Sequence, residues 1–114
     1  MSVDCLFCKI VAGTIPAKLF YEDDVSLCFA DIRPQAPTHL LIIPKEHVAS
    51  TAYVEQKHAA LLGHLVVKAA ETAANVGLGG GYRIVVNTGE DGGQTVSHLH
   101  LHLLGGRPMN WPPG

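Results

Sequence analysis

The sequence predicts one α+β domain over residues 1–114, built from a five-stranded, mainly antiparallel sheet, one long helix and a short N-terminal helix. Two observations carry this prediction. Short runs of aliphatic and aromatic residues are separated by turn-forming residues, which is typical of strands joined in hairpins. Residues 55–76 instead place apolar side chains at helical spacing. Hairpins together with one helix favour the α+β class.

The first elements are short. Residues 5–12 predict a helical turn, because four apolar side chains lie at helical spacing before the breaker Gly13. Residues 18–21 and 25–30 are aromatic and aliphatic runs on either side of the acidic triplet 22–24. This pattern predicts a hairpin.

Three further strands are predicted along the chain. Residues 31–37 hold two prolines and form an ordered loop before a strand at 39–43, which Pro44 ends. Residues 82–86 and 98–104 supply the fourth and fifth strands. The glycine- and proline-rich tail that follows is not expected to be regular, although it carries the single tryptophan, Trp111.

The predicted long helix has an apolar stripe and ends at Gly77 and the glycines that follow it. The stripe consists of Leu61, Leu62, Leu65, Val66, Ala69, Ala70 and Ala73. His58 and His64 belong to this helix and are assigned to structure or to its surface.

Composition narrows the class of function. The formal net charge is −2 and the eight basic residues are scattered, so the sequence predicts no basic surface for a nucleic-acid backbone. The chain begins without a secretory pattern and has no apolar stretch near the ~20 residues that a membrane span needs. We therefore expect a cytoplasmic protein with no membrane partner, and three cysteines suit a reducing compartment.

The most informative feature is a run of alternating histidines and leucines at residues 98–103. Side chains alternate faces on a strand, so His98, His100 and His102 are expected to share one face, about 6.6 Å apart along the strand, while the leucines face the core. Crowded imidazoles favour the neutral form, which is nucleophilic near neutral pH. Three such side chains behind a glycine-bearing loop predict a reactive site.

This run resembles the signature of the histidine triad superfamily. Other segments resemble its nucleotide-binding protein branch almost end to end. They are residues 7–10, 15–18, 22–24, 31–32 and 34–39, Asn87, residues 92–95, 105–107 and 111–114. The resemblance implies a purine nucleoside phosphoramidase, with aminoacyl adenylate-type compounds among its substrates. It also implies a homodimer whose sheet continues across the two subunits.

The resemblance assigns catalytic roles to three histidines. His100 is expected to attack the α-phosphorus and form a nucleotidyl-histidine that water then hydrolyses. His102 is expected to contact the phosphoryl group and help deliver a proton to the departing amine. His39 matches the supporting histidine that orients His100. No cofactor is expected to take part in the reaction.

The same resemblance assigns the substrate-binding residues. Asn87, Gly93 and Thr95 match the phosphate side, and Asp31 matches the carboxylate that takes the ribose hydroxyls. Trp111 matches a tail residue that reaches the partner subunit's site. The residues that match the apolar purine pocket are Phe7, Ile10, Ile15, Phe29 and Ile32, although apolar residues of this kind also form ordinary protein cores.

Two thiols and two imidazoles offer a Cys2His2 set of the kind that tetrahedral zinc accepts: Cys5, Cys8, His47 and His98. Some bacterial histidine triad proteins and the related galactose-1-phosphate uridylyltransferases carry structural zinc on matching residues. A structural zinc ion here would free His98 from catalysis. Free thiols are the alternative, and Cys28 is expected to be a small buried strand residue.

Other functions remain open at this point. One is a nucleotide-binding adaptor that acts through its dimer surface, and another is a metallohydrolase with the three histidines on zinc. Gln94-Thr95-Val96 resembles the dinucleoside polyphosphate hydrolases, but the tail argues against that branch. A uridylyltransferase is disfavoured because His102 stands where those enzymes have glutamine. Ser97 and Ala30 depart from the nucleotide-binding branch, which leaves the preferred base and leaving group open.

Overall fold

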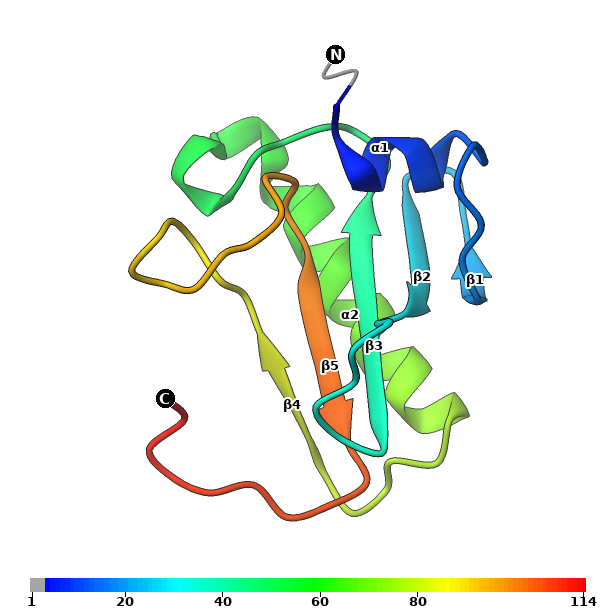
Figure 1. The fold of residues 1–114 in the computed structure, drawn as a ribbon, viewed down its shortest axis with the longest axis vertical. Helices are drawn as coiled ribbons and strands as arrows, with labels where there is room; N and C mark the ends of the chain where they lie inside the picture. Colours follow the sequence, from blue (N-terminus) through cyan, green and yellow to red (C-terminus); the bar gives the residue numbers. More distant parts are fainter. Residues whose placement is uncertain (1–3) are drawn as a thin grey trace.

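The structure, a computed structural model, describes residues 4–114. Its five strands form one sheet in the order β1-β2-β3-β5-β4, with every neighbouring pair antiparallel (Figure 1). The elements are α1 (Leu6–Val11), β1 (Leu19–Glu22), β2 (Ser26–Ala30), β3 (Thr38–Pro44), α2 (Ala59–Asn75), β4 (Tyr82–Val85) and β5 (Leu101–Gly105). The predicted α+β class, with a five-stranded sheet, one long helix and a short N-terminal helix, is confirmed.

Two cores lie on opposite faces of the sheet. In Figure 1, α2 runs behind the sheet and α1 crosses its upper end. Alternate residues of β3 divide between these faces, since Leu40 and Ile42 pack with α2 whereas Leu41 and Ile43 pack with α1 and Phe7. The candidate site opens on the α1 side. Among residues 4–114, no helix has the length and apolar character that crossing a bilayer requires.

The histidine run differs from the prediction. The fifth strand was expected to begin at His98, but β5 begins at Leu101. The backbone before it is held by other contacts, including a 2.6 Å hydrogen bond from the Leu99 amide to the Val48 carbonyl. Leu99, Leu101 and Leu103 still join the core under α2. The predicted division of faces therefore holds for the leucines, while regular pairing starts three residues later.

The long helix also begins later than predicted. Residues Gln56–His58 form a 3-10 turn, and α2 starts at Ala59. His58 is the reason for the turn, because its Nδ1 accepts a 2.9 Å hydrogen bond from the Glu55 amide, as in a capping box. Its Nε2 donates to Glu46 at 3.1 Å. His58 is therefore a buried structural residue, as its assignment to structure or surface anticipated.

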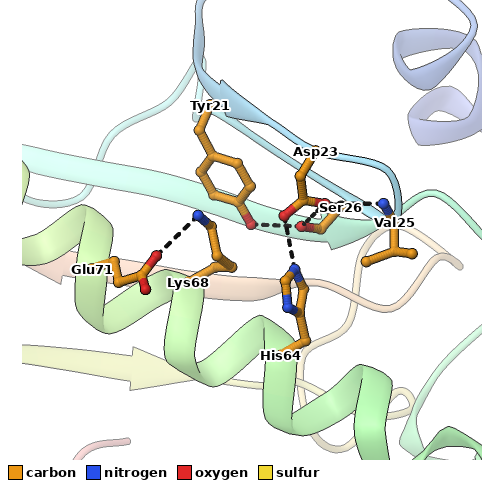
Figure 2. Close-up of polar contacts among 7 residues, drawn as sticks. All are labelled: Tyr21, Asp23, Val25, Ser26, His64, Lys68 and Glu71. Carbon is orange, nitrogen blue, oxygen red and sulfur yellow. Dashed lines mark hydrogen bonds and ion pairs between the residues drawn. The ribbon is translucent and has the colours of Figure 1, made fainter.

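His64 ties α2 to the turn between β1 and β2 (Figure 2). Its Nε2 donates to Oδ2 of Asp23 at 2.8 Å. Oδ1 of the same carboxylate accepts from the amides of Val25 and Ser26 at 3.0 and 2.7 Å and from the Ser26 hydroxyl at 2.9 Å. Tyr21 completes the group with a 2.9 Å contact to the Ser26 hydroxyl. One carboxylate thus both shapes the hairpin and anchors it on the helix.

These contacts predict a pH-dependent contribution of Asp23 to stability. Burial alone would raise the pKa of Asp23, but the hydrogen bonds from His64, Val25 and Ser26 outweigh burial and hold it well below its usual value. A depressed folded-state pKa gives stability that is present above the unfolded value of about 4 and is lost below it. Asp23→Asn should lower the free energy of unfolding by about 1–2 kcal/mol at pH 7, and by less at pH 3.

The comparison is made by denaturant unfolding at both pH values, with Asp24→Asn as the control. Asp24 is the neighbouring exposed carboxylate, and its neutralisation should change stability by no more than about 0.5 kcal/mol. Equal losses for Asp23→Asn at pH 7 and pH 3 would contradict the proposed origin of the effect.

Candidate functional site

A cavity of about 600 Å³ opens on the α1 side of the sheet. Its wall combines apolar side chains with His100, His102, the Asp31 carboxylate and two basic residues, Lys18 and Arg33. Of the residues singled out in the sequence, the wall contains Phe7, Ile10, Ile15, Phe29, Asp31, Ile32, Thr95, His100 and His102. An apolar pocket with a few convergent polar groups is the usual form of a small-molecule site.

The tautomer of His100 is set by the backbone carbonyl of His98. Nδ1 of His100 lies 2.6 Å from the carbonyl oxygen of His98. A carbonyl only accepts, so Nδ1 carries the proton and Nε2 keeps a lone pair. Burial lowers the pKa of His100, and the hydrogen bond to His98 opposes this only in part. The ring also packs edge-on against Phe7 at 5.1 Å between centroids. His100 is therefore a neutral, oriented imidazole with a free Nε2.

His39 and His102 form a hydrogen-bonded pair. The β3–β5 pairing sets Leu41 opposite His102, which brings His39 and His102 to the same face of neighbouring strands. Nε2 of His39 lies 2.9 Å from Nδ1 of His102, and the Gln35 amide donates to Nδ1 of His39 at 3.0 Å.

This hydrogen bond from a backbone amide decides both tautomers. Nδ1 of His39 accepts from Gln35, so the proton of His39 sits on Nε2, which donates to His102. Nδ1 of His102 is then an acceptor, and its proton sits on Nε2. Burial, followed by the proximity of His100 and His39, lowers the pKa of His102 to about 4. Burial also lowers the pKa of His39, against the opposing charge of Asp31. Both rings are neutral at pH 7.

Asp31 stands beside this pair. Its Oδ2 lies 3.5 Å from Nε2 of His39, and its Oδ1 accepts from the Arg33 amide at 2.7 Å. Asp31, His39 and His102 bring their ligand atoms within 4.8 Å of one another, as a metal site would. However, the proton that Gln35 directs to Nε2 of His39 occupies the position that a metal ion would need. The metallohydrolase alternative needs His98, His100 and His102 on one zinc ion, whereas His98 lies among Cys5, Cys8 and His47.

His98 faces a different set of partners. It was expected to share a face with His100 and His102, but its ring lies among two cysteines and His47. Nε2 of His98 donates to the Pro44 carbonyl at 2.9 Å, so Nδ1 keeps its lone pair. Burial lowers the pKa of His98, which keeps the ring neutral. A neutral imidazole whose other nitrogen donates to a carbonyl is the usual form of a metal-ligating histidine.

The spacings of this cluster match a tetrahedral zinc site. Sγ of Cys5 lies 3.3 Å from Nδ1 of His98, and Sγ of Cys8 lies 3.3 Å from Nδ1 of His47 and 3.6 Å from that of His98. The two histidine nitrogens are 3.1 Å apart. Bond lengths of about 2.3 Å to sulfur and about 2.05 Å to nitrogen place tetrahedral ligands about 3.6 Å (S to N) and about 3.4 Å (N to N) apart. The four residues therefore fit zinc.

Metal binding by this cluster requires Cys8 to lose a proton. Burial, and then the neighbouring Cys5, raise the pKa of the Cys8 thiol to about 11. Metal binding requires the thiolate, so the affinity for zinc must increase with pH. Cys28 takes no part: it is buried in the core under α2, and burial raises its pKa to about 12.

Three residues predicted to bind substrate lie outside the cavity wall. Asn87 donates from Nδ2 to the Gly92 carbonyl at 2.7 Å and so holds its own loop. Gly93 stands in that loop with φ of +79°, a conformation that suits glycine. Trp111 is 83% exposed in the tail. Gln35 lies in one of the segments that resemble the family, but its contribution comes from a backbone amide, which no side-chain pattern reveals.

Comparison with known families agrees with this geometry. The HIT domain model matches residues 12–109. The chain belongs to the HIT family. A HIT family hydrolase from Legionella pneumophila Philadelphia 1 is 54% identical, with a TM-score of 0.96, and the match covers 97% of this chain and 100% of that one.

Two other relatives have names that refer to a metal or a ligand. The 14 kDa zinc-binding protein of Zea mays is 50% identical over 111 residues, which cover 96% of this chain and 87% of the maize protein. The histidine triad nucleotide-binding protein from Candida albicans is 30% identical, with a TM-score of 0.81, and the match covers 96% of this chain and 83% of that one.

Proposed function

We propose that this HIT protein hydrolyses purine nucleoside 5′-phosphoramidates, aminoacyl adenylate-type compounds included, through a nucleotidyl intermediate on His100. One observation carries the proposal: the 2.6 Å hydrogen bond from Nδ1 of His100 to the His98 carbonyl, which leaves Nε2 unprotonated in a ring that lines the cavity. A neutral imidazole of this kind attacks without a separate base.

The cavity suits a purine nucleotide. Phe7, Ile10, Ile15 and Phe29 offer an apolar surface for the base, and Asp31 offers carboxylate oxygens to the two ribose hydroxyls. Thr95 adds a hydroxyl near the two histidines for the phosphate side. The phosphorus would then lie between the nucleophile and the histidine pair.

In the first step, Nε2 of His100 bonds to the α-phosphorus while the phosphorus–nitrogen bond breaks and the amine leaves with its electron pair. The amine nitrogen takes one proton from solution, because a neutral His102 cannot give up its own proton without becoming an imidazolate. His102 instead donates an Nε2–H hydrogen bond to a phosphoryl oxygen. This role is narrower than the proton delivery predicted from the sequence.

The intermediate and its breakdown follow from the same contacts. The nucleotidyl-histidine keeps its Nδ1 proton and is cationic, and the His98 carbonyl stabilises it through the existing hydrogen bond. In the second step, water attacks the phosphorus, the bond to Nε2 breaks, and one proton returns to solution. The products are the nucleoside monophosphate and neutral His100.

We further propose that Cys5, Cys8, His47 and His98 hold a structural zinc ion. The ligand spacings and the zinc-binding relative from maize support this. The ion would supply no chemistry to the reaction. It would fix α1 to the segments that follow β3 and precede β5, and so keep Phe7 and His100 in contact.

A homodimer is also proposed, with the sheet continuing through β4. β4 lies at one end of the strand order and, among residues 4–114, pairs only with β5; an unpaired edge is a ready site for another strand. Exposed Tyr82 and Val86 lie on or beside it. Trp111 stands on the tail, from which it would reach the partner subunit's cavity.

Gln94 favours the phosphoramidase over the dinucleoside polyphosphate hydrolase. Its amide nitrogen donates to the carbonyls of Ala49 and Val96 at 2.7 and 2.9 Å, and its oxygen accepts from the Gly89 amide at 3.0 Å. All of these hydrogen bonds of the Gln94 side chain are made to the backbone, and they stabilise the loop that contains Gln94. The likeness of this segment to the hydrolase branch therefore does not mark a substrate contact.

Trapping the intermediate tests the proposed function. Acid decomposes a phosphohistidine bond whereas base preserves it, so the reaction with a radiolabelled adenosine 5′-phosphoramidate is quenched rapidly in base. We expect a labelled protein whose adduct maps to His100 and is lost in acid. Turnover without any adduct, or an adduct on another residue, would contradict the proposal.

The assignment of Asp31 predicts a specific loss. Asp31→Asn should raise KM for a ribonucleoside phosphoramidate by roughly 10- to 100-fold, the value of a hydrogen bond to a charged group. The same substitution should change KM for the 2′-deoxy substrate much less, because one of the two hydroxyls is already missing. The four KM values form a cycle that separates ribose recognition from any effect on His39. Equal losses for both substrates would exclude Asp31 as the ribose ligand.

A further inference from the structure

The turn that follows β5 packs against the loop between β2 and β3. Gly106 adopts φ of +93°, and a Cβ built on it would lie 2.9 Å from Cβ of Pro37. Only glycine allows the turn to come this close. The residue that follows, Arg107, is thereby brought to the outer side of the loop that carries Asp31 and Gln35.

The Arg107 guanidinium holds that loop by a hydrogen bond to the loop backbone. Nη2 of Arg107 donates to the Gln35 carbonyl at 2.9 Å, and Nη1 donates to the Pro108 carbonyl at 3.1 Å. Arg107 lines a separate cavity of about 560 Å³, together with Tyr82 and Arg83, and is not part of the wall of the candidate active site. It therefore has no direct route to a substrate in that site.

Gln35 connects Arg107 to the histidine pair. Its carbonyl accepts from Arg107 while its amide donates to Nδ1 of His39, and its side chain donates to the Arg33 carbonyl at 2.9 Å. One exposed residue is thus held from three directions. Holding the carbonyl fixes the orientation of the residue, and hence the direction in which its amide points.

We propose that Arg107 is a positioning residue that sets the tautomers of His39 and His102 through Gln35. The order of donors is the Arg107 guanidinium to the Gln35 carbonyl, the Gln35 amide to Nδ1 of His39, and Nε2 of His39 to Nδ1 of His102. The effect on catalysis rests on the proposed function, whereas the effect on the tautomers is independent of it.

Loss of the hydrogen bond from Arg107 to Gln35 changes the tautomers of two histidines. Without the Gln35 amide, only the Asp31 carboxylate, 3.5 Å away, still favours the proton on Nε2 of His39. A fraction of His39 then carries its proton on Nδ1, and Nε2 presents a lone pair to His102. His102 then adopts the tautomer with its proton on Nδ1, which donates to His39 and leaves a lone pair on Nε2 of His102. A lone pair facing a phosphoryl oxygen repels it, whereas an N–H stabilises it. Arg107 therefore keeps His102 in the donor form.

The test is a long-range ¹H–¹⁵N spectrum of uniformly labelled protein, which distinguishes the two neutral tautomers of each histidine. In the native protein we expect the Nε2–H form for His39 and His102 and the Nδ1–H form for His100. Arg107→Met keeps the apolar stem but has no donor. It should convert His39 and His102 to mixtures of tautomers and leave His100 unchanged.

Arg83→Met is the matched control. Arg83 lines the same outer cavity and also donates to a backbone carbonyl, that of Asn110 at 2.8 Å, but no hydrogen bond joins it to Gln35 or His39. Its replacement should leave the tautomers of His39 and His102 as they are in the native protein. Arg107→Lys retains one donor and should give an intermediate result; it decides the matter if Arg107→Met does not fold.

Kinetics supply a second readout. Arg107→Met should lower kcat for a nucleoside phosphoramidate by roughly 10- to 100-fold, the usual loss when an outer partner of a functional imidazole is removed, with KM little changed. Native tautomers of His39 and His102 in folded Arg107→Met, or in Arg107→Lys if the first variant is unfolded, would overturn the proposal. A protein without phosphoramidase activity whose tautomers still respond to Arg107 would overturn only the proposed function.

Discussion

Replacing His100 with alanine should lower kcat/KM for an adenosine 5′-phosphoramidate by at least roughly 10⁴-fold, the scale of loss for a nucleophile. No neighbouring group can take its place. Nδ1 of His102 accepts from His39, so its Nε2 carries a proton, and the ring of His98 faces the cysteines. The rate is measured in a steady-state assay of amine release.

Two measurements separate chemistry from folding and binding. His100→Ala should bind a non-hydrolysable nucleotide with an affinity within about tenfold of the native value, since most of the cavity wall is intact. The matched control is His64→Ala, which removes an imidazole from the surface of α2 and should keep native turnover. A His100→Ala protein with native turnover would refute the assignment of the nucleophile.

The zinc cluster carries the largest expected effect on stability. Protein purified without added metal should contain about one zinc ion per chain, and Cys5→Ser should abolish this. Cys5 is both a ligand and the N-cap of α1, where its sulfur accepts from the Cys8 amide at 3.3 Å. We expect a loss of about 3 kcal/mol or more in the free energy of unfolding and a decrease of about 10 °C or more in Tm.

Cys28→Ala is the control for this experiment. Cys28 is buried in the core under α2, away from the cluster, so its replacement should leave the metal content unchanged. Chelation of the native protein should reproduce the decrease in Tm that Cys5→Ser gives. A metal content of about one ion per chain in Cys5→Ser would exclude Cys5 as a ligand, and metal-free native protein would contradict the site as a whole.

Much of the fold could be predicted because its sequence signals are local. Alternation in β3 and the leucines of residues 99–103 identified the two faces of the sheet, and the apolar stripe identified α2. The starts of β5 and α2 were predicted three and four residues early. The boundary of β5 was decided by a tertiary contact with the Val48 carbonyl, and that of α2 by a local capping contact of the His58 side chain.

The site was predictable to the extent that side-chain identity determines it. The pattern of Cys5, Cys8, His47 and His98 identified a cluster that the fold does bring together. Side-chain patterns could not reveal that the His98 carbonyl and the Gln35 amide set the tautomers of His100 and His39. Every residue has a backbone carbonyl and every residue except proline has an amide N–H, and only the folded chain shows which of them point at a ring.

The division of residues 99–103 between two faces has a consequence for how this segment can change. Each leucine fills the core under α2, and His100 and His102 face the opposite side. Deleting or inserting one residue there would turn the imidazoles into the hydrocarbon interior and expose the leucines to water. Evolution can therefore exchange one side chain for another along this stretch, but any viable change in its length must come in pairs.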